Sequence, residues 1–288
     1  MKNPHGRSTS GVRFLVPAMM ALLTLPGVAG AHDFWLAGER ADDSAPPAVR
    51  MQLGHALHAE EVRAYDAAST ISLRLITPEG KRSIIGSARN GALPYHTLPR
   101  DTPTPAMVVL NRKPVTLALP NKKFASYLQE EHLGDMLALQ RRQTPTASGE
   151  DRERYTRHIK ALVTGPDAGS HDVHAAVIGL PLEIVLLDAP HDPQAAEELR
   201  ARVLFQGEPL AGATLTVLHH PTGDFKSHGS SRTVKTDGDG VARFRYDKPG
   251  FWLLRMVHMK PCPKCRGADW RSYWAAYAIQ QDWLPPKK

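Results

Sequence analysis

Basic runs, long apolar runs and cysteines are all scarce in this sequence of 288 residues. No cluster of Lys and Arg forms a basic stripe, so nucleic-acid binding is not expected. After the first 31 residues, the most apolar stretch carries Pro181 and Glu183, which is typical of strands rather than of a membrane helix. The sequence also lacks a G-x-S-x-G motif, a phosphate-binding loop and a zincin helix motif, so no familiar catalytic motif indicates an enzyme.

The two cysteines, Cys262 and Cys265, lie close together in "PCPKC". An oxidising compartment favours a disulfide between them. The alternative is a soft-metal pair, because Met256, His258 and Met259 precede the cysteines and thioether, imidazole and thiolate ligands suit Cu(I). A redox-catalytic role is disfavoured, since the motif follows a strand instead of beginning a helix.

Residues 1–31 have the pattern of a signal peptide, with three basic residues, an apolar run and small residues at the end. Cleavage is expected before His32 or, one residue earlier, before Ala31. The mature chain of about 257 residues would then be periplasmic or secreted. Because the leader carries three of the basic groups and no acidic group, the formal charge of +7 falls to about +4 in the mature chain.

The sequence pattern after residue 31 predicts a mainly β protein with two sandwich-like or barrel-like parts. Residues 32–178 form an N-terminal β domain, in which two charged segments within about 124–163 show helical spacing of apolar residues. The second of these is "GEDRERYTRHIKALV". Residues 179–288 contain strands at the regular spacing of a C-terminal sandwich, immunoglobulin-like or prealbumin-like.

Several short motifs occur in a characteristic order: "AHDFWL", "LGH", "ERYTRHIKALV", "GLPLEIVLLDAP", "TDGDGVARF", "GFWLLRMVHM" and "WRSYWAAYAI". In this order they resemble the NikM-like periplasmic family, whose members include substrate-binding components for nickel or cobalt uptake and orphan proteins with a domain of unknown function. The resemblance implies a transition-metal ion held by the mature N-terminus, the histidine beside it and a second histidine. The matching positions are His32 and His55. It also implies a membrane transporter component as partner, although the chain shows no C-terminal membrane helix.

The residues at the mature start support metal binding independently. An N-terminal amine has a pKa near 8, so a metal ion can displace its proton near neutral pH. Cleavage before His32 would provide amine and imidazole from one residue, and cleavage before Ala31 would add the His32 amide nitrogen. Nickel and copper favour such nitrogen-rich sets, and His55 could complete either one. Asp33 is expected to hydrogen-bond an imidazole.

Other histidines, of the fourteen in the chain, are weaker candidates. His58 follows His55 by three residues, and His258 could reach the same site from a neighbouring strand. Solvated loop positions are expected for His171, His174, His219 and His220.

These patterns predict an exported carrier or uptake accessory for nickel, copper or cobalt, and not an enzyme. Two alternatives remain: a copper-dependent oxidative enzyme with a histidine brace, and a structural or adhesion module without metal.

Overall fold

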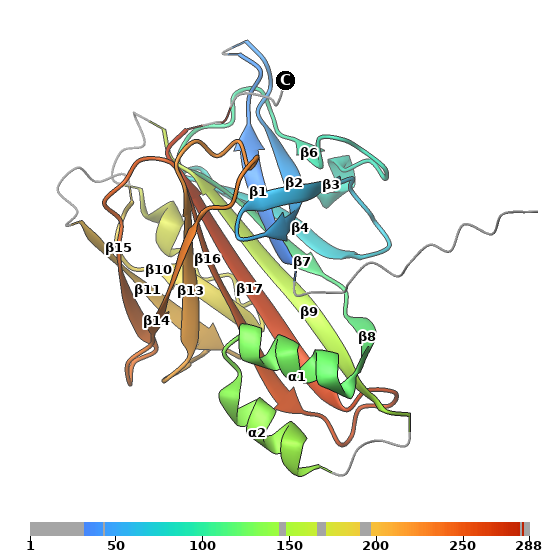
Figure 1. Ribbon diagram of the computed structural model, residues 1–288. Helices are drawn as coiled ribbons and strands as arrows, with labels where there is room; N and C mark the ends of the chain where they lie inside the picture. Colours follow the sequence, from blue (N-terminus) through green and yellow to red (C-terminus); the bar gives the residue numbers. More distant parts are fainter. Residues whose placement is uncertain are drawn as a thin grey trace, which may run out of the picture. The chain divides into compact units, whose positions relative to one another are not determined.

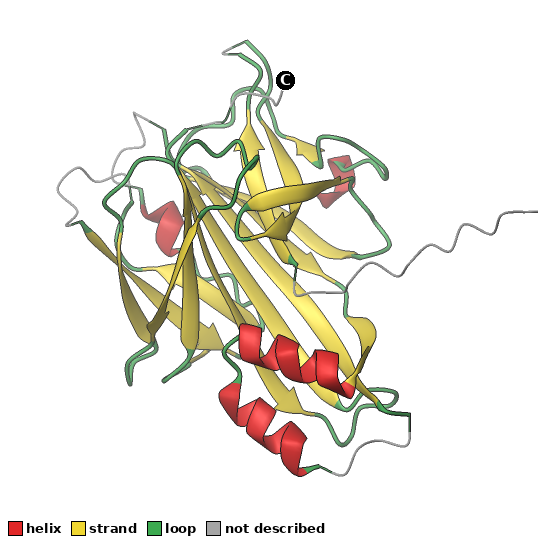
Figure 2. Ribbon diagram, in the orientation of Figure 1, coloured by secondary structure: helices red, strands yellow, loops and turns green. Residues whose placement is uncertain are grey.

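The computed structural model describes residues 32–42, 44–143, 148–165, 171–190, 197–282 and 284. The predicted signal peptide lies outside these residues. The largest element is a nine-stranded sheet (Figures 1 and 2), in which all neighbours are antiparallel except the parallel pair β17 and β9. In spatial order its strands are β14 (Ser230–Lys235), β13 (Thr214–His220), β16 (Phe251–Pro261), β17 (Trp270–Gln280), β9 (Glu150–Val163), β7 (Ala106–Arg112), β4 (Thr70–Thr77) and β5 (Gly80–Ser83), with β8 (Val115–Pro120) also paired to β9.

Two smaller sheets complete the β structure. One contains β1 (Asp33–Glu39), β2 (Ala48–His55), β3 (His58–Arg63) and the short β6 (His96–Thr97). The other contains β10 (Leu182–Leu186), β11 (Glu198–Phe205), β12 (Glu208–Pro209) and β15 (Val241–Arg245). Single turns of 3₁₀ helix occur at Ile85–Ser87 and Asp172–Ala175.

The small sheets cover opposite faces of the large one. Side chains alternate along a strand, so the central strand β9 contributes Ile159 to the core beneath β1 and β2, and Leu162 to the core beneath β10 and β11. These two apolar layers confirm the prediction of a mainly β, sandwich-like fold. In the described part of the chain no sheet closes into a barrel.

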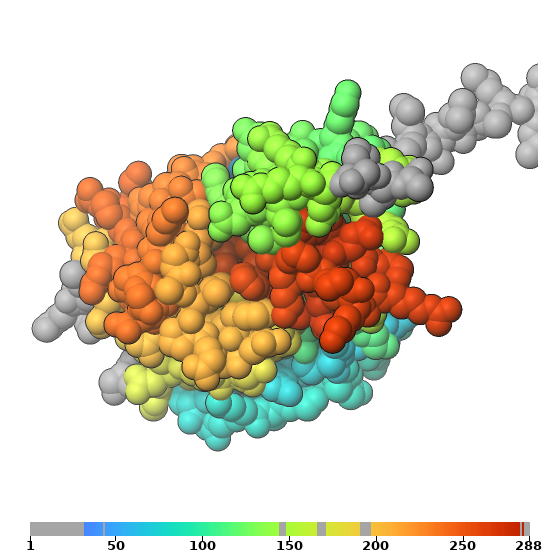
Figure 3. All heavy atoms as spheres, turned by 90° about the horizontal axis from the view of Figure 1, so that it is seen from below, coloured from blue at the N-terminus to red at the C-terminus, as the bar shows by residue number. Residues whose placement is uncertain are grey.

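The helices differ from the prediction in position. The first predicted helical segment, residues 124–142, is divided between α1 (Asn121–Glu130), which begins three residues before it, and α2 (Gly134–Arg142). The helical conformation is interrupted between them at His132, whose left-handed backbone (φ 58°) ends α1. On α1, Phe124, Tyr127 and Leu128 pack against Trp270, and the space-filling view in Figure 3 shows both helices beside this C-terminal segment.

The second predicted helix is wrong, because residues 150–163 form the long strand β9. Tyr155, Ile159 and Leu162 have helical spacing, and that spacing suggested the helix. At the start of the strand, however, Asp151 and Glu153 are buried while Arg152 and Arg154 are exposed, which is the alternation of a strand. The buried carboxylates have tertiary partners: Asp151 accepts a hydrogen bond from the Trp270 indole and Glu153 accepts one from Tyr127.

Strands from both predicted domains share the large sheet. β17, from the C-terminal range, pairs with β9 from Trp270↔Glu153 to Gln280↔Val163. The domain boundary near residue 178 remains a prediction. None of the described helices is long and apolar enough to span a membrane.

Candidate functional site

The first described residues are held in place by a buried ionic network. The Asp33 carboxylate, 2% exposed, lies 2.6 Å from the Arg255 guanidinium on β16 and accepts a hydrogen bond from the Ala56 N–H. Arg255 also pairs with Glu131, directly after α1. Asp33 therefore binds a guanidinium and a backbone amide instead of the imidazole predicted for it. The network joins the start of β1, the β2–β3 turn and the end of α1.

Burial determines the electrostatics of this network. Desolvation raises the pKa of both Asp33 and Glu131, and the charge of Arg255 opposes the rise at each carboxyl. Removing Arg255 would leave two buried carboxylates unpaired, which is strongly unfavourable. Arg255 is thus a structural anchor for the start of β1.

His32 and His55 come together at the edge of the β1–β2–β3 sheet. Asp33 pairs with Gly54, so the residue before it, His32, lies level with His55 on the next strand. Their ring centroids are 5.5 Å apart, and the His32 Nε2 lies 3.1 Å from a carboxylate oxygen of Glu60. The His32 side chain is 26% exposed, so solvent reaches the pair. Of the predicted ligands, these two are brought together most directly.

His58 lies across a tight turn from His55, and the two residues are cross-strand partners. Its ring, however, faces His228, with centroids 4.9 Å apart. Sequence reasoning missed His228, which lies in the loop before β14. The N–H of the next residue, Gly229, donates to the Ala56 carbonyl and brings the loop to the turn. No local pattern predicts that contact, because it joins segments about 170 residues apart in the chain.

His258 does not join this group. Arg255 and His258 are three residues apart on β16, so they lie on opposite faces of the sheet. Arg255 faces Asp33, whereas the His258 ring packs on Phe205 at a centroid distance of 4.4 Å. Burial lowers the pKa of His258, with a smaller contribution from the charge of Lys260.

Cys262 and Cys265 form a disulfide in the loop after β16, with Cα atoms 5.2 Å apart. The loop is also held by backbone hydrogen bonds from Cys262 to Asp269 and from Cys265 to Cys262. Both sulfurs are consumed by the bond, so the pair offers no thiolate to a soft metal in this state.

The expectation of solvated loops for four further histidines is correct only for His171, which is exposed. His174, His219 and His220 are buried at 4%, 8% and 1% exposure. Their side chains serve the fold: His219 contacts the Pro249 carbonyl oxygen and His220 accepts a hydrogen bond from the Gly223 N–H.

Within the described residues, no group of three or more His, Cys, Asp or Glu side chains is arranged to hold a metal ion. The site consists of two imidazole pairs, His32 with His55 and His58 with His228, on either side of the β2–β3 turn. Each pair supplies two nitrogen donors. A complete coordination set at either pair needs at least one further donor.

The fold and the two histidine pairs define a class of protein: a β-sandwich with histidines gathered at the edge of the β1–β2–β3 sheet. A family model described as a domain of unknown function, DUF4198, matches residues 29–260, and the chain belongs to this family. The match agrees with the expected orphan relatives, while the link to nickel- and cobalt-uptake proteins remains a prediction. No curated protein and no solved structure matches the chain.

Proposed function

We propose that the protein is an exported carrier or uptake accessory that binds a divalent transition-metal ion, nickel or copper before cobalt, at its mature N-terminus. The observation that carries the proposal is the approach of His32 and His55, whose ring centroids are 5.5 Å apart. Metal–nitrogen bonds of about 2 Å allow two imidazoles at this separation to share one ion.

The free N-terminus supplies the missing donor in this proposal. Removal of the leader places an amine at or next to His32, and that amine can lose a proton to the metal near neutral pH. Glu60, 3.1 Å from the His32 ring, either adds a carboxylate ligand or hydrogen-bonds the imidazole. Asp33, directly behind His32, is held by Arg255 and limits movement of the new terminus.

The test is mass spectrometry and titration calorimetry on protein exported with its own leader and purified from the periplasm. Intact mass identifies the cut before Ala31 or His32 and the metal stoichiometry. We expect one Ni²⁺ or Cu²⁺ per chain and a loss of at least about tenfold in affinity in His32→Ala and in His55→Ala. His171→Ala, at an exposed histidine, is the matched control.

A second form of the protein tests the amine alone. Residues 32–288 expressed in the cytoplasm behind an N-terminal tag that is not removed keep both imidazoles but place the amine several residues away from His32, whichever cut the exported protein carries. We expect weaker binding than in the exported protein. Retention of the leader by the exported chain, or equal affinity in both forms, would remove the amine from the site.

Two outcomes would replace the proposal. An absence of Ni²⁺ and Cu²⁺ binding tighter than millimolar would favour a structural or adhesion module. Oxygen consumption with copper and a reductant, abolished in His32→Ala, would favour an oxidative enzyme.

A further inference from the structure

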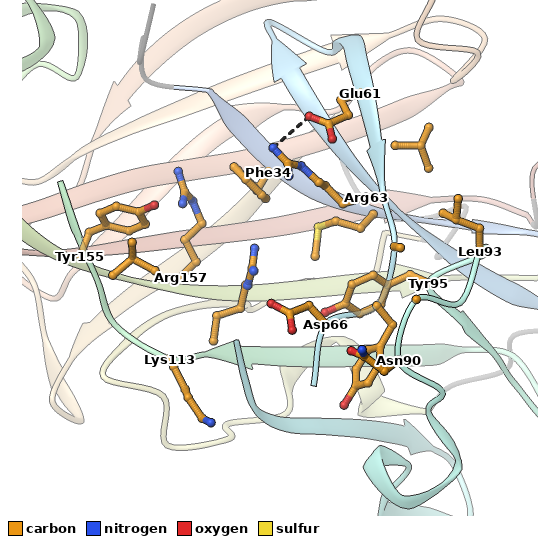
Figure 4. A pocket seen from close by; sticks show the side chains of 17 residues that line it. Phe34, Glu61, Arg63, Asp66, Asn90, Leu93, Tyr95, Lys113, Tyr155 and Arg157 are labelled. Atoms are coloured by element: carbon orange, nitrogen blue, oxygen red, sulfur yellow. Dashed lines mark ion pairs between the residues drawn. The ribbon is translucent and has the colours of Figure 1, made fainter. Parts of the chain in front are cut away.

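A cleft of about 630 Å³ opens beside the β1–β2–β3 sheet (Figure 4). It is lined by segments far apart in the chain, including Phe34 on β1, Tyr95 in a loop, Lys113 before β8 and Arg157 on β9. Clefts of this size bury small organic ligands.

The lining has more positive than negative charge. It contains four cationic side chains, Arg63, Arg112, Lys113 and Arg157, and two carboxylates, Glu61 and Asp66. Glu61 lies 2.9 Å from Arg63 and neutralises it, as the dashed line in Figure 4 marks.

Asp66 offsets one more of these cations. The pKa of Asp66 is lowered, mainly by a hydrogen bond from Ser69 and more weakly by the charge of Arg112, while desolvation opposes the shift. This carboxyl is therefore ionised at neutral pH. Neither carboxylate of the cleft then pairs with Lys113 or Arg157 in the described part of the chain, although Asp33 and Glu153, which lie outside the lining, interact electrostatically with Arg157.

Arg157 is held in an unusual environment. Its guanidinium carbon lies 4.0 Å from the centroid of Phe34, 4.5 Å from that of Tyr155 and 5.0 Å from that of Trp274. Its Nε is buried and has no hydrogen-bond partner among the described residues. The aromatic rings and a hydrogen bond with Tyr155 fix the plane of the guanidinium, and a guanidinium held in this way suits charge-assisted binding of a planar anion.

The wall of the cleft is apolar and partly open to solvent. Leu93 and Val115, exposed at 56% and 43%, both line it. They place apolar surface beside the charged groups of the cleft, the combination that ligand pockets use.

We propose that this cleft binds a small organic carboxylate with an apolar or aromatic body. The carboxylate pairs with Arg157 and Lys113, and the body packs on Phe34, Leu93 and Val115. The site uses none of the histidines of the proposed metal site, so each proposal can fail without the other.

The experiment is calorimetry with three probes of one size: phenylpropionate, its neutral amide, and phenyl phosphate. The protein is stripped of metal on a chelating resin and used without soluble chelator, because EDTA is itself a polycarboxylate. We expect phenylpropionate to bind at least about tenfold more tightly than its amide, since only the carboxylate forms charge-assisted hydrogen bonds.

Two variants locate the site. Arg157→Gln is expected to weaken phenylpropionate binding by about tenfold or more, and Lys113→Gln by about threefold. Lys264→Gln, at an exposed lysine in the disulfide loop, is the matched control. Lys113 is exposed at the surface, so its variant carries the test if Arg157→Gln does not fold.

Equal affinity for phenylpropionate and its amide, or no binding of either in the millimolar range, would overturn the proposal. So would unchanged affinity in folded Lys113→Gln and Arg157→Gln proteins. Tighter binding of phenyl phosphate than of phenylpropionate would overturn the assignment to carboxylates.

Discussion

At the scale of single residues, the largest resolved effect of burial on a histidine is at His158, in the centre of β9. The side chain is 2% exposed and its Nδ1 lies 2.9 Å from the Asn111 amide oxygen. Burial lowers the pKa of His158 to about 4, and the charge of Glu183 opposes the shift. The folded protein therefore keeps this imidazole neutral at a pH where the unfolded chain protonates it.

This difference predicts a loss of stability in acid. A group whose pKa is depressed in the folded state contributes stability above its unfolded pKa of about 6.5, and that contribution is lost as the pH falls towards 4. His158→Asn keeps a hydrogen-bond donor near the Nδ1 position but cannot titrate. We expect its stability relative to the parent protein to improve by about 2–3 kcal/mol between pH 7 and pH 4, measured by urea denaturation.

Comparison within one pH series is needed because Asp33, Glu131 and Glu153 have raised pKa values and act in the opposite direction. His171→Asn, at an exposed position, should follow the parent curve. A difference between His158→Asn and the parent that stays constant with pH would contradict the prediction.

At the scale of elements, the β2–β3 hairpin positions both histidine pairs. Its two turn residues, Ala56 and Leu57, have φ values of 45° and 64°, in the left-handed region that favours glycine. Leu57 is fully buried in the core beneath the sheet, so packing maintains its conformation. Just before the turn, a Cβ on Gly54 would collide with the His58 carbonyl, which explains the glycine in "LGH".

The left-handed backbone at Ala56 predicts that glycine is better there. Relief of the steric penalty exceeds the added entropy of the unfolded chain, so Ala56→Gly should raise the free energy of unfolding by about 0.5–1 kcal/mol. The matched control is Ala59→Gly on β3, which should lower it by a similar amount. Denaturant titration measures both, and destabilisation by Ala56→Gly would show that its methyl contact outweighs the backbone strain.

At the scale of the whole molecule, strand β1 and the segment at the end of β17 depend on each other. Gln280, at the end of β17, exchanges two hydrogen bonds of 2.9 Å with the backbone of Gly38 on β1. Leu284 forms a parallel bridge with Glu39, in which its backbone N–H donates to the Gly38 carbonyl and its carbonyl accepts from the Arg40 N–H. The C-terminal segment thus holds the strand that directly follows His32.

This dependence predicts that residues 32–178 and 179–288 do not fold separately. A cut near 178 would remove β17 from β9 and expose apolar surface on both faces of the large sheet. We expect the full mature chain to unfold in one cooperative denaturant transition, neither fragment to do so alone, and coexpression of both to restore the transition. Cooperative unfolding of the 32–178 fragment by itself would instead establish it as an independent domain.

Sequence patterns were sufficient for the fold class and for one pair of candidate ligands. Alternating apolar residues and turn signals are local, so most strands were predictable, and the position of His32 beside an expected cleavage site was visible in the leader. The β9 segment was not predictable, because Asp151 and Glu153 look like the polar side of a helix until Trp270 and Tyr127 are known to bind them.

The sequence by itself therefore determined the β-rich class and predicted the donor groups available around His32. Only the tertiary structure decided which side chains distant in the sequence meet: His58 with His228, and Arg157 with Phe34. The physical reason is that these contacts depend on sheet order and strand face. Both are determined by the burial of apolar surface across segments more than a hundred residues apart, which no local pattern records.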